Sequence, residues 1–306
     1  MIMFLIRRLL QTIPVIIGVT IVVFLIMQLV PGDPAQIMAG EGASQQAVED
    51  LRKEYGLDKP LYTQYFNYMK DLVQGDLGNS LKSNQPVLDE ILIRLPITVE
   101  LAIYSTILTV ILGLIFGIIS AVRANSLSDI TVMVIALLGI SFPSFFLGML
   151  LIYFFSIQLQ WLPVAGWDSV RHMILPALAL GAGGAAIVAR MTRSSMLEVI
   201  QQDYIRTARA KGMGSMIIIF KHALRNALIP VITVVGLQFG ALLGGTVLIE
   251  SIFAINGLGR LIVESIRMRD LPMVQGGVLV ASLIFVLVNL IVDISYNFFN
   301  KRIDLN

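Results

Sequence analysis

The chain has 306 residues, of which 57% are hydrophobic and 14% are charged, whereas soluble domains average roughly 45–50% apolar and about 25% charged residues. With a mean hydropathy of +0.84, the apolar residues exceed what one soluble core buries, which excludes a soluble globular enzyme and predicts an integral membrane protein. The formal net charge is only +2, so composition gives no case for nucleic-acid binding. With no cysteine and two histidines, disulfides and thiolate metal sites are excluded.

Six apolar segments are candidate membrane spans, since a helix needs roughly 20 residues to cross about 30 Å of hydrocarbon. Five of them lack Asp, Glu, Lys and Arg: Leu9–Val30, Leu101–Val122, Thr131–Ser156, Ala227–Ile249 and Leu271–Val292. The sixth, Met173–Ala189, is shorter, but tryptophans precede it and arginines follow it, which is typical of membrane interfaces. We therefore expect an all-α membrane protein with six transmembrane helices. The first run is too long for the hydrophobic region of a signal peptide and is expected to be retained.

Basic residues in short loops orient the chain, because Lys and Arg are retained on the cytoplasmic side of membranes. With the N-terminus inside, the expected cytoplasmic segments carry twelve Lys and Arg residues, seven of them between Arg190 and Arg225. The short outer loops carry only four. We therefore expect both termini to be cytoplasmic.

The segment between the first two spans turns abruptly polar and is long enough for a small extracytoplasmic helical subdomain. Apolar residues recur at helical spacing after Ser44 and after Pro60, and a third short helical pattern follows Pro86. This subdomain is either a cap on the outer mouth or a docking surface for an extracytoplasmic partner. The predicted divisions are 1–30 for the N-terminus and first span, 31–97 for the subdomain, 98–299 for a five-helix core with a cytoplasmic loop at 190–226, and 300–306 for a cytoplasmic tail.

The inner loop Arg190–Asn226 exceeds the roughly 2–8 residues that join neighbouring helices. It contains the helix-forming run Arg206–Lys211, which Gly212 stops, and then the apolar stretch Met216–Phe220. A short helix on the cytoplasmic surface satisfies this pattern. The loop either serves only the orientation of the chain or docks a cytoplasmic protein.

Glycines inside apolar spans predict close helix packing, because glycines four residues apart let backbones approach. Lining of a substrate path is the alternative. The glycines concerned are Gly113, Gly117, the cluster Gly181–Gly184, Gly236, Gly240 and Gly244.

Pro143 lies midway along the third span, where it must free a backbone carbonyl and kink the helix. It marks either a gate or a packing kink. Glu100 and Asp293 lie near span ends, which argues against the buried carboxylate relay of a proton-driven carrier. A phosphate-cradling loop of the GxxxxGK[ST] type is missing from the sequence. We therefore predict no catalytic residue, bound cofactor or metal site in this chain.

Several separated motifs resemble the permease subunits of dipeptide and oligopeptide ABC importers, the inner-membrane components of binding-protein-dependent transport. The likeness runs along nearly the whole chain, with the motifs in the right order. The motifs are Pro31–Pro34, Gly75–Gly78, Met191–Met196, Asp203–Gly212, His222–Pro230 and Gly257–Arg260.

The resemblance implies a type I ABC importer permease fold whose inner loop forms a coupling helix in a groove of an ATPase subunit, over about Arg206–Phe220. In the family's E-A-A motif, only the second alanine is kept here, as Ala208. The residues so assigned to ATPase coupling are Arg206, Thr207, Ala208, Arg209, Ala210, Lys211, Gly212, Met213, Gly214, Ser215 and Met216.

The resemblance also implies partners in a bacterial or archaeal plasma (inner) membrane: a second homologous permease, two ABC ATPase subunits that use ATP and Mg, and an extracytoplasmic substrate-binding protein. The chain itself is expected to be a non-catalytic transport subunit. Similar permeases serve importers of glutathione and of nickel or other metal chelates, so these remain alternative cargoes. An ATP-independent channel or secondary carrier is an alternative of another class, and it predicts transport without nucleotide.

Overall fold

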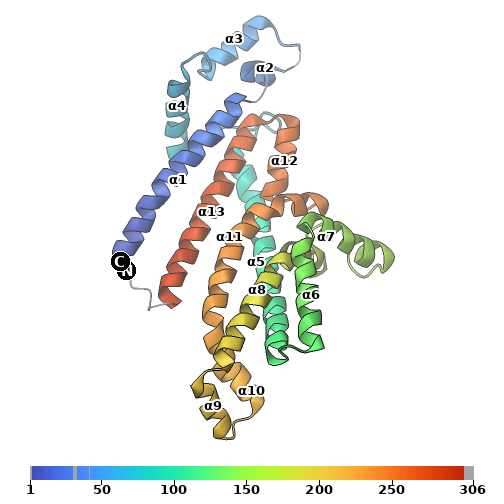
Figure 1. Ribbon diagram of the computed structural model, residues 1–306. Coiled ribbons are helices and arrows are strands. Elements are labelled where there is room, and N and C mark those ends of the chain that lie inside the picture. Colours follow the sequence, from blue (N-terminus) through green and yellow to red (C-terminus); the bar gives the residue numbers. More distant parts are fainter. Residues whose placement is uncertain (1, 30–32, 41, 300–306) are drawn as a thin grey trace. The chain divides into compact units, whose positions relative to one another are not determined.

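A computed structural model describes residues 2–29, 33–40 and 42–299 (Figure 1). These residues form helices and connecting loops, and the only strand-like pairing among them is one bridge between Asn79 and Pro86. The expected tail 300–306 and the first two residues of the Pro31–Pro34 motif lie outside the described residues. The elements are α1 (Ile2–Leu29), α2 (Pro34–Ala39), α3 (Gln45–Glu54), α4 (Leu61–Val73), α5 (Val87–Val122), α6 (Leu127–Ser141), α7 (Ser144–Leu151), the π-helical η1 (Ile152–Gln158), α8 (Val170–Ile200), α9 (Asp203–Ala210), α10 (Ser215–Ile217), the π-helical η2 (Ile218–Leu224), α11 (Arg225–Ile252), α12 (Leu258–Met268) and α13 (Leu271–Phe299).

The chain divides into two compact units. The first contains the residues up to Pro96 together with Gly257–Val286, and the second contains Ile97–Asn256 together with the residues from Leu287 onward. Helices α5 and α13 therefore contribute their first parts to the first unit and their later parts to the second.

The first unit has a small apolar core where the start of α5 meets α12 and the start of α13. Its buried members are Val87, Ile91, Leu258, Leu261 and Met273. The loop before α5 is tied to the start of α13 through the buried Asp270, whose carboxylate accepts hydrogen bonds from the Ser80 hydroxyl and, at 3.1 Å, from the Leu81 backbone N–H.

Helices α3 and α4 begin where the sequence predicts, after Ser44 and Pro60. The Ser44 hydroxyl accepts a hydrogen bond from the Ala47 backbone N–H at 3.3 Å, which is a typical N-cap. The third predicted pattern is different, because it is the first part of α5, a continuous helix of 36 residues, and not a separate short helix. The charged residues before Leu101 end the uncharged run, but they do not end the helix. Glu90 and Arg94 are compatible with the helix because they form an i,i+4 ion pair of 3.5 Å along it.

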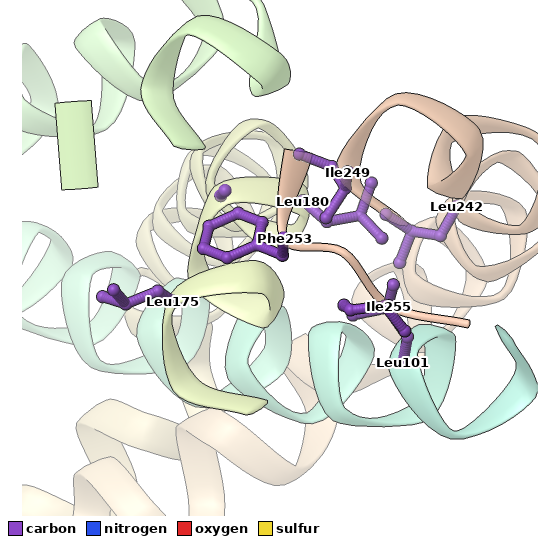
Figure 2. Close-up of a cluster of buried hydrophobic side chains, with 8 residues drawn as sticks. Leu101, Leu175, Leu180, Leu242, Ile249, Phe253 and Ile255 are labelled. Atoms are coloured by element: carbon purple, nitrogen blue, oxygen red, sulfur yellow. The ribbon is translucent and has the colours of Figure 1, made fainter. Parts of the chain in front are cut away.

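The second unit is organised around α8, which packs against α6, α7 and α11. Its largest core combines Leu101 of α5 and residues of α8 with Ile249, Phe253 and Ile255 from the end of α11 and the loop beyond it. Figure 2 shows Phe253 grouped with Leu180 and Ile249, and Ile255 beside Leu101. Helix α5 approaches α8 closely at Gly113 and Gly117, where an added Cβ would lie 2.5 Å from Val188 and 2.4 Å from Thr192.

Four described helical segments are long and apolar enough to cross a membrane: Val87–Val122, Val170–Ile200, Ser215–Leu242 and Leu271–Val292. A fifth span results if the bent pair Leu127–Ser141 and Ser144–Gln158 is one span. Within α1, the apolar stretch Leu10–Leu25 is shorter than this criterion requires. The all-α membrane architecture is confirmed, whereas the predicted count of six spans is reached only by including α1.

Candidate functional site

Helix α9 is the strongest candidate for a coupling element because one of its faces is built into the second unit. Ile205 is fully buried and Ala208 is 6% exposed. The three-residue spacing puts both on one side of the helix, where they share a core with Met196 of α8 and Ala223 of η2. Any displacement of α9 must therefore act on the ends of the helices that pack around it.

The segment after α9 turns sharply instead of continuing as one helix to Phe220. Lys211 caps α9, and Gly212 adopts a φ of +74°, a conformation that suits glycine and is costly for residues with a Cβ. A new helical stretch then starts at Ser215 and leads through α10 and η2 into α11. The implied single helix over Arg206–Phe220 is thus two helical pieces joined by a turn.

Most of the predicted coupling residues face solvent. Among residues 206–216, which we call the coupling segment, Ala208 is buried and Met213 packs partly against the same core, while the other nine are exposed. Large apolar side chains are exposed at Met216 and, just beyond, at Ile217 and Phe220. A basic surface with exposed apolar side chains is suited to protein docking.

A hydrogen bond between side chains holds α9 to the start of α11. The Asn226 amide donates to the Tyr204 hydroxyl at 2.8 Å and to the His222 backbone carbonyl at 3.0 Å. The exposed ion pair between Arg206 and Asp203 is long, at 3.8 Å, and contributes little to stability. Apolar packing and the Asn226–Tyr204 hydrogen bond therefore hold α9 in place, and this ion pair adds little.

An ion pair that no sequence pattern predicts connects α6 to α8, with a buried carboxylate and a partly buried guanidinium. The Arg193 guanidinium donates to both carboxylate oxygens of Asp129, at 2.8 and 2.7 Å, and the Asp129 side chain is only 5% exposed. The Asn125 backbone N–H, at 2.9 Å, and the Ser120 hydroxyl complete the hydrogen bonding of this carboxylate. The serine three residues before Asp129 does signal a helix start, but nothing local points to an arginine 64 positions away.

The helical structure is interrupted at Pro143. Helix α6 ends at Ser141, α7 starts at Ser144, and the two are bent by 108°. A cavity of about 240 Å³ adjoins the break and is lined by Phe142 and Ser144, by Gly183 and Gly184 of α8, and by Gln238 of α11. Pro143 thus marks a broken helix next to a cavity, and two members of the predicted glycine cluster line that cavity.

Three of the glycines of α11, Gly236, Gly240 and Gly244, have different surroundings. A Cβ at Gly236 would lie 2.7 Å from Cγ1 of Val292, and one at Gly240 would lie 3.0 Å from Oδ1 of Asn289. Gly244 has no such atom within 4 Å among the described residues. Two of the three predicted packing glycines therefore contact α13. The side chain of Asp293, one turn beyond Asn289, lies outside the described residues.

Glu250 is a second charged residue that the sequence analysis missed, because it follows the last residue of the predicted fifth span. It is fully buried, and the Thr98 hydroxyl donates to its carboxylate at 2.7 Å. Glu100 instead accepts a hydrogen bond from the Trp167 indole at 3.0 Å in an exposed position. Among the residues that the structure describes, no three His, Cys, Asp or Glu side chains are grouped as metal ligands.

Two family models together match most of the chain. One, described as the binding-protein-dependent transport system inner membrane component, matches residues 113–305, and its N-terminal counterpart matches residues 1–102. The chain belongs to this family. It is therefore a membrane permease component of a transport system that works with a binding protein, as the motifs predict.

Relatives that the chain matches over nearly their whole length agree with this assignment. The dipeptide transport system permease protein DppB of Alkalihalophilus pseudofirmus is 48% identical over 325 residues, which cover 97% of this chain and 98% of the relative. The glutathione transport system permease protein GsiC of Escherichia coli (strain K12) is 50% identical over 303 residues, which cover 99% of each chain.

Solved structures show the same fold. An inward-facing conformation of the MetNI methionine ABC transporter matches with a TM-score of 0.56 at 20% identity, covering 69% of this chain and 96% of that one. The crystal structure of an amino acid ABC transporter matches with a TM-score of 0.51 at 16% identity, covering 70% and 94%. The predicted ABC importer permease fold is thereby confirmed.

Proposed function

We propose that this chain is one permease subunit of an ATP-driven importer of dipeptides and oligopeptides, and that it forms half of the translocation pore. The observation that carries the proposal is the 48% identity to a dipeptide permease over 97% of this chain. Glutathione is a second candidate cargo, which the 50% identity to a glutathione permease favours. Both cargoes are small peptides.

The proposed assembly contains a second homologous permease, two ABC ATPase subunits that bind ATP and Mg, and an extracytoplasmic binding protein. The coupling segment docks on an ATPase subunit and therefore lies in the cytoplasm. Both chain termini lie there too, because an even number of the six expected spans separates each terminus from this segment. The ATPase pair shifts the permease between inward-facing and outward-facing states only by docking more favourably to one of them. Movement of α9 passes to α8 through the core that holds Ile205, and from α8 to α6 through the Asp129–Arg193 pair.

The test uses the intact complex in proteoliposomes and measures uptake of a labelled dipeptide together with ATP hydrolysis. Charge reversal of two exposed residues, Arg206→Glu with Arg209→Glu, is expected to lower dipeptide uptake by about tenfold or more, since it places repulsive charge at the docking surface. The matched control is Arg123→Glu, an exposed arginine in another predicted cytoplasmic loop, which should leave uptake unchanged.

The outcomes separate the alternatives. Unchanged uptake in the double variant would exclude the coupling role of these residues. Transport that proceeds without nucleotide would replace the importer with a channel or secondary carrier. Uptake of glutathione that dipeptides do not compete with would assign glutathione as the cargo.

A further inference from the structure

The first unit contains a cavity of about 530 Å³ that the coupling role leaves unexplained. Its lining comes from the end of α1, from the end of α3 and the turn after it, from α4 and the loop after it, and from the start of α13, all within this one unit. Small-molecule sites in proteins typically measure about 300–1,000 Å³ and combine an apolar wall with a few polar groups. The size of this cavity is therefore suited to a ligand as small as a short peptide.

The apolar wall of the cavity is aromatic. The rings of Phe24 and Tyr68 stack with their centroids 6.1 Å apart and their planes 27° apart. Tyr65, which does not line the cavity, packs edge-on against the Phe24 ring. Its hydroxyl shares a hydrogen bond of 2.9 Å with the Thr20 hydroxyl. Partial burial raises the pKa of the Tyr68 phenol above its ordinary value of 10.0, while the nearby Gln275 side chain acts in the opposite direction.

The polar wall carries negative charge only. Asp71 and Asp76 contribute carboxylates, Asn67 and Gln275 contribute amides, and no residue of the described lining is Lys or Arg. Asp76 also holds the turn after α4, since it accepts a hydrogen bond from the Gly78 backbone N–H at 2.8 Å. Anionic ligands are disfavoured by this lining, whereas a cation is attracted both by the carboxylates and by the aromatic faces.

We propose that this cavity binds the amino end of a short peptide, with the ammonium group facing Asp71 and an adjoining apolar side chain against Phe24 and Tyr68. The site deepens the proposed function and rests on it for the identity of the ligand. Because the carboxylates are exposed, the affinity is modest. Such a site holds the peptide near the permease surface and leaves tight recognition to the binding protein.

The experiment measures equilibrium binding of labelled Phe-Ala to the full chain in nanodiscs, without ATP, ATPase subunits or binding protein. The matched probe is N-acetyl-Phe-Ala, which has the same side chains but no ammonium group. We expect acetylation to weaken binding by about tenfold, and Asp71→Asn to weaken it by about three- to fivefold, as the loss of a partly exposed ion pair would. Asp58→Asn is the control, since Asp58 lies in the same outer segment but outside the cavity lining.

Two further measurements keep the outcome decisive. Tyr68→Phe retains the aromatic face, so it should retain binding, whereas Tyr68→Ala should lose most of it. Equal binding of both probes, or an unchanged affinity in Asp71→Asn, overturns the proposal, and so does absence of binding at millimolar peptide. These failures concern only the cavity, because dipeptide uptake by the intact complex is measured separately. Binding to the cavity without dipeptide uptake would instead refute the proposed cargo and keep the site.

Discussion

Helix α9 and the helices α3 and α4 all have amphipathic sequences, but they use their side chains differently. In α9 the apolar positions Ile205 and Ala208 are buried in a core shared with other helices. No residue of α3 or α4, all of which are described, is fully buried. In α4, Tyr65 and Tyr68 contact Phe24 of α1, while Tyr62 and Phe66 are 77% and 71% exposed. A helix anchored in a core can transmit displacement, whereas exposed rings such as Tyr62 and Phe66 offer a contact surface.

Two ion pairs that differ in burial, Asp129–Arg193 and Asp33–Arg52, provide the largest expected effect in this comparison. Arg193→Ala leaves the Asp129 carboxylate, 5% exposed, without its cation and should cost about 3–5 kcal/mol in free energy of unfolding. Arg52→Ala removes a partly exposed partner of Asp33 in the first unit and should cost at most about 1 kcal/mol. Unfolding of the full chain by titration with a denaturing detergent measures both, and similar losses would contradict the contrast.

Truncation of a large apolar side chain should also lower the free energy of unfolding more in α9 than in α4. Ile205→Ala removes a fully buried side chain and should lower the free energy of unfolding by about 3 kcal/mol, since it leaves a cavity in the core under α9. Phe66→Ala removes a larger but exposed side chain and should change it by no more than about 0.5 kcal/mol. The same titration tests both variants, and Ile217→Ala, at 48% exposure, is a control close to α9. A large loss in Phe66→Ala would show that α4 packs far more tightly than its exposure indicates.

The sequence was sufficient for features that depend on local patterns and insufficient for those that depend on distant partners. Helical spacing predicts α3 and α4, the helix-forming run before Gly212 predicts α9, and Pro143 predicts the kink that the structure shows as a break between α6 and α7. Each of these signals lies within a few residues. Asp129 pairs with an arginine 64 residues away, Glu250 with a threonine 152 residues away and Asp270 with a serine 190 residues away, beyond any local pattern. Only the fold brings these side chains together, so a single sequence gives no means of pairing them.

The smallest expected effect concerns the glycines of α11, which identical spacing makes equivalent in sequence. Gly236→Ala places a Cβ 2.7 Å from Cγ1 of Val292, so α11 and α13 must shift apart, at a cost of about 1–3 kcal/mol. Gly244→Ala meets no described atom within 4 Å and should be neutral or stabilising by up to about 1 kcal/mol, since alanine favours helix. Melting of the full chain in detergent distinguishes the two variants. Equal destabilisation would mean that Gly244 also packs against a neighbour, which the described residues do not include. The spacing of the glycines alone would then have identified the packing face correctly.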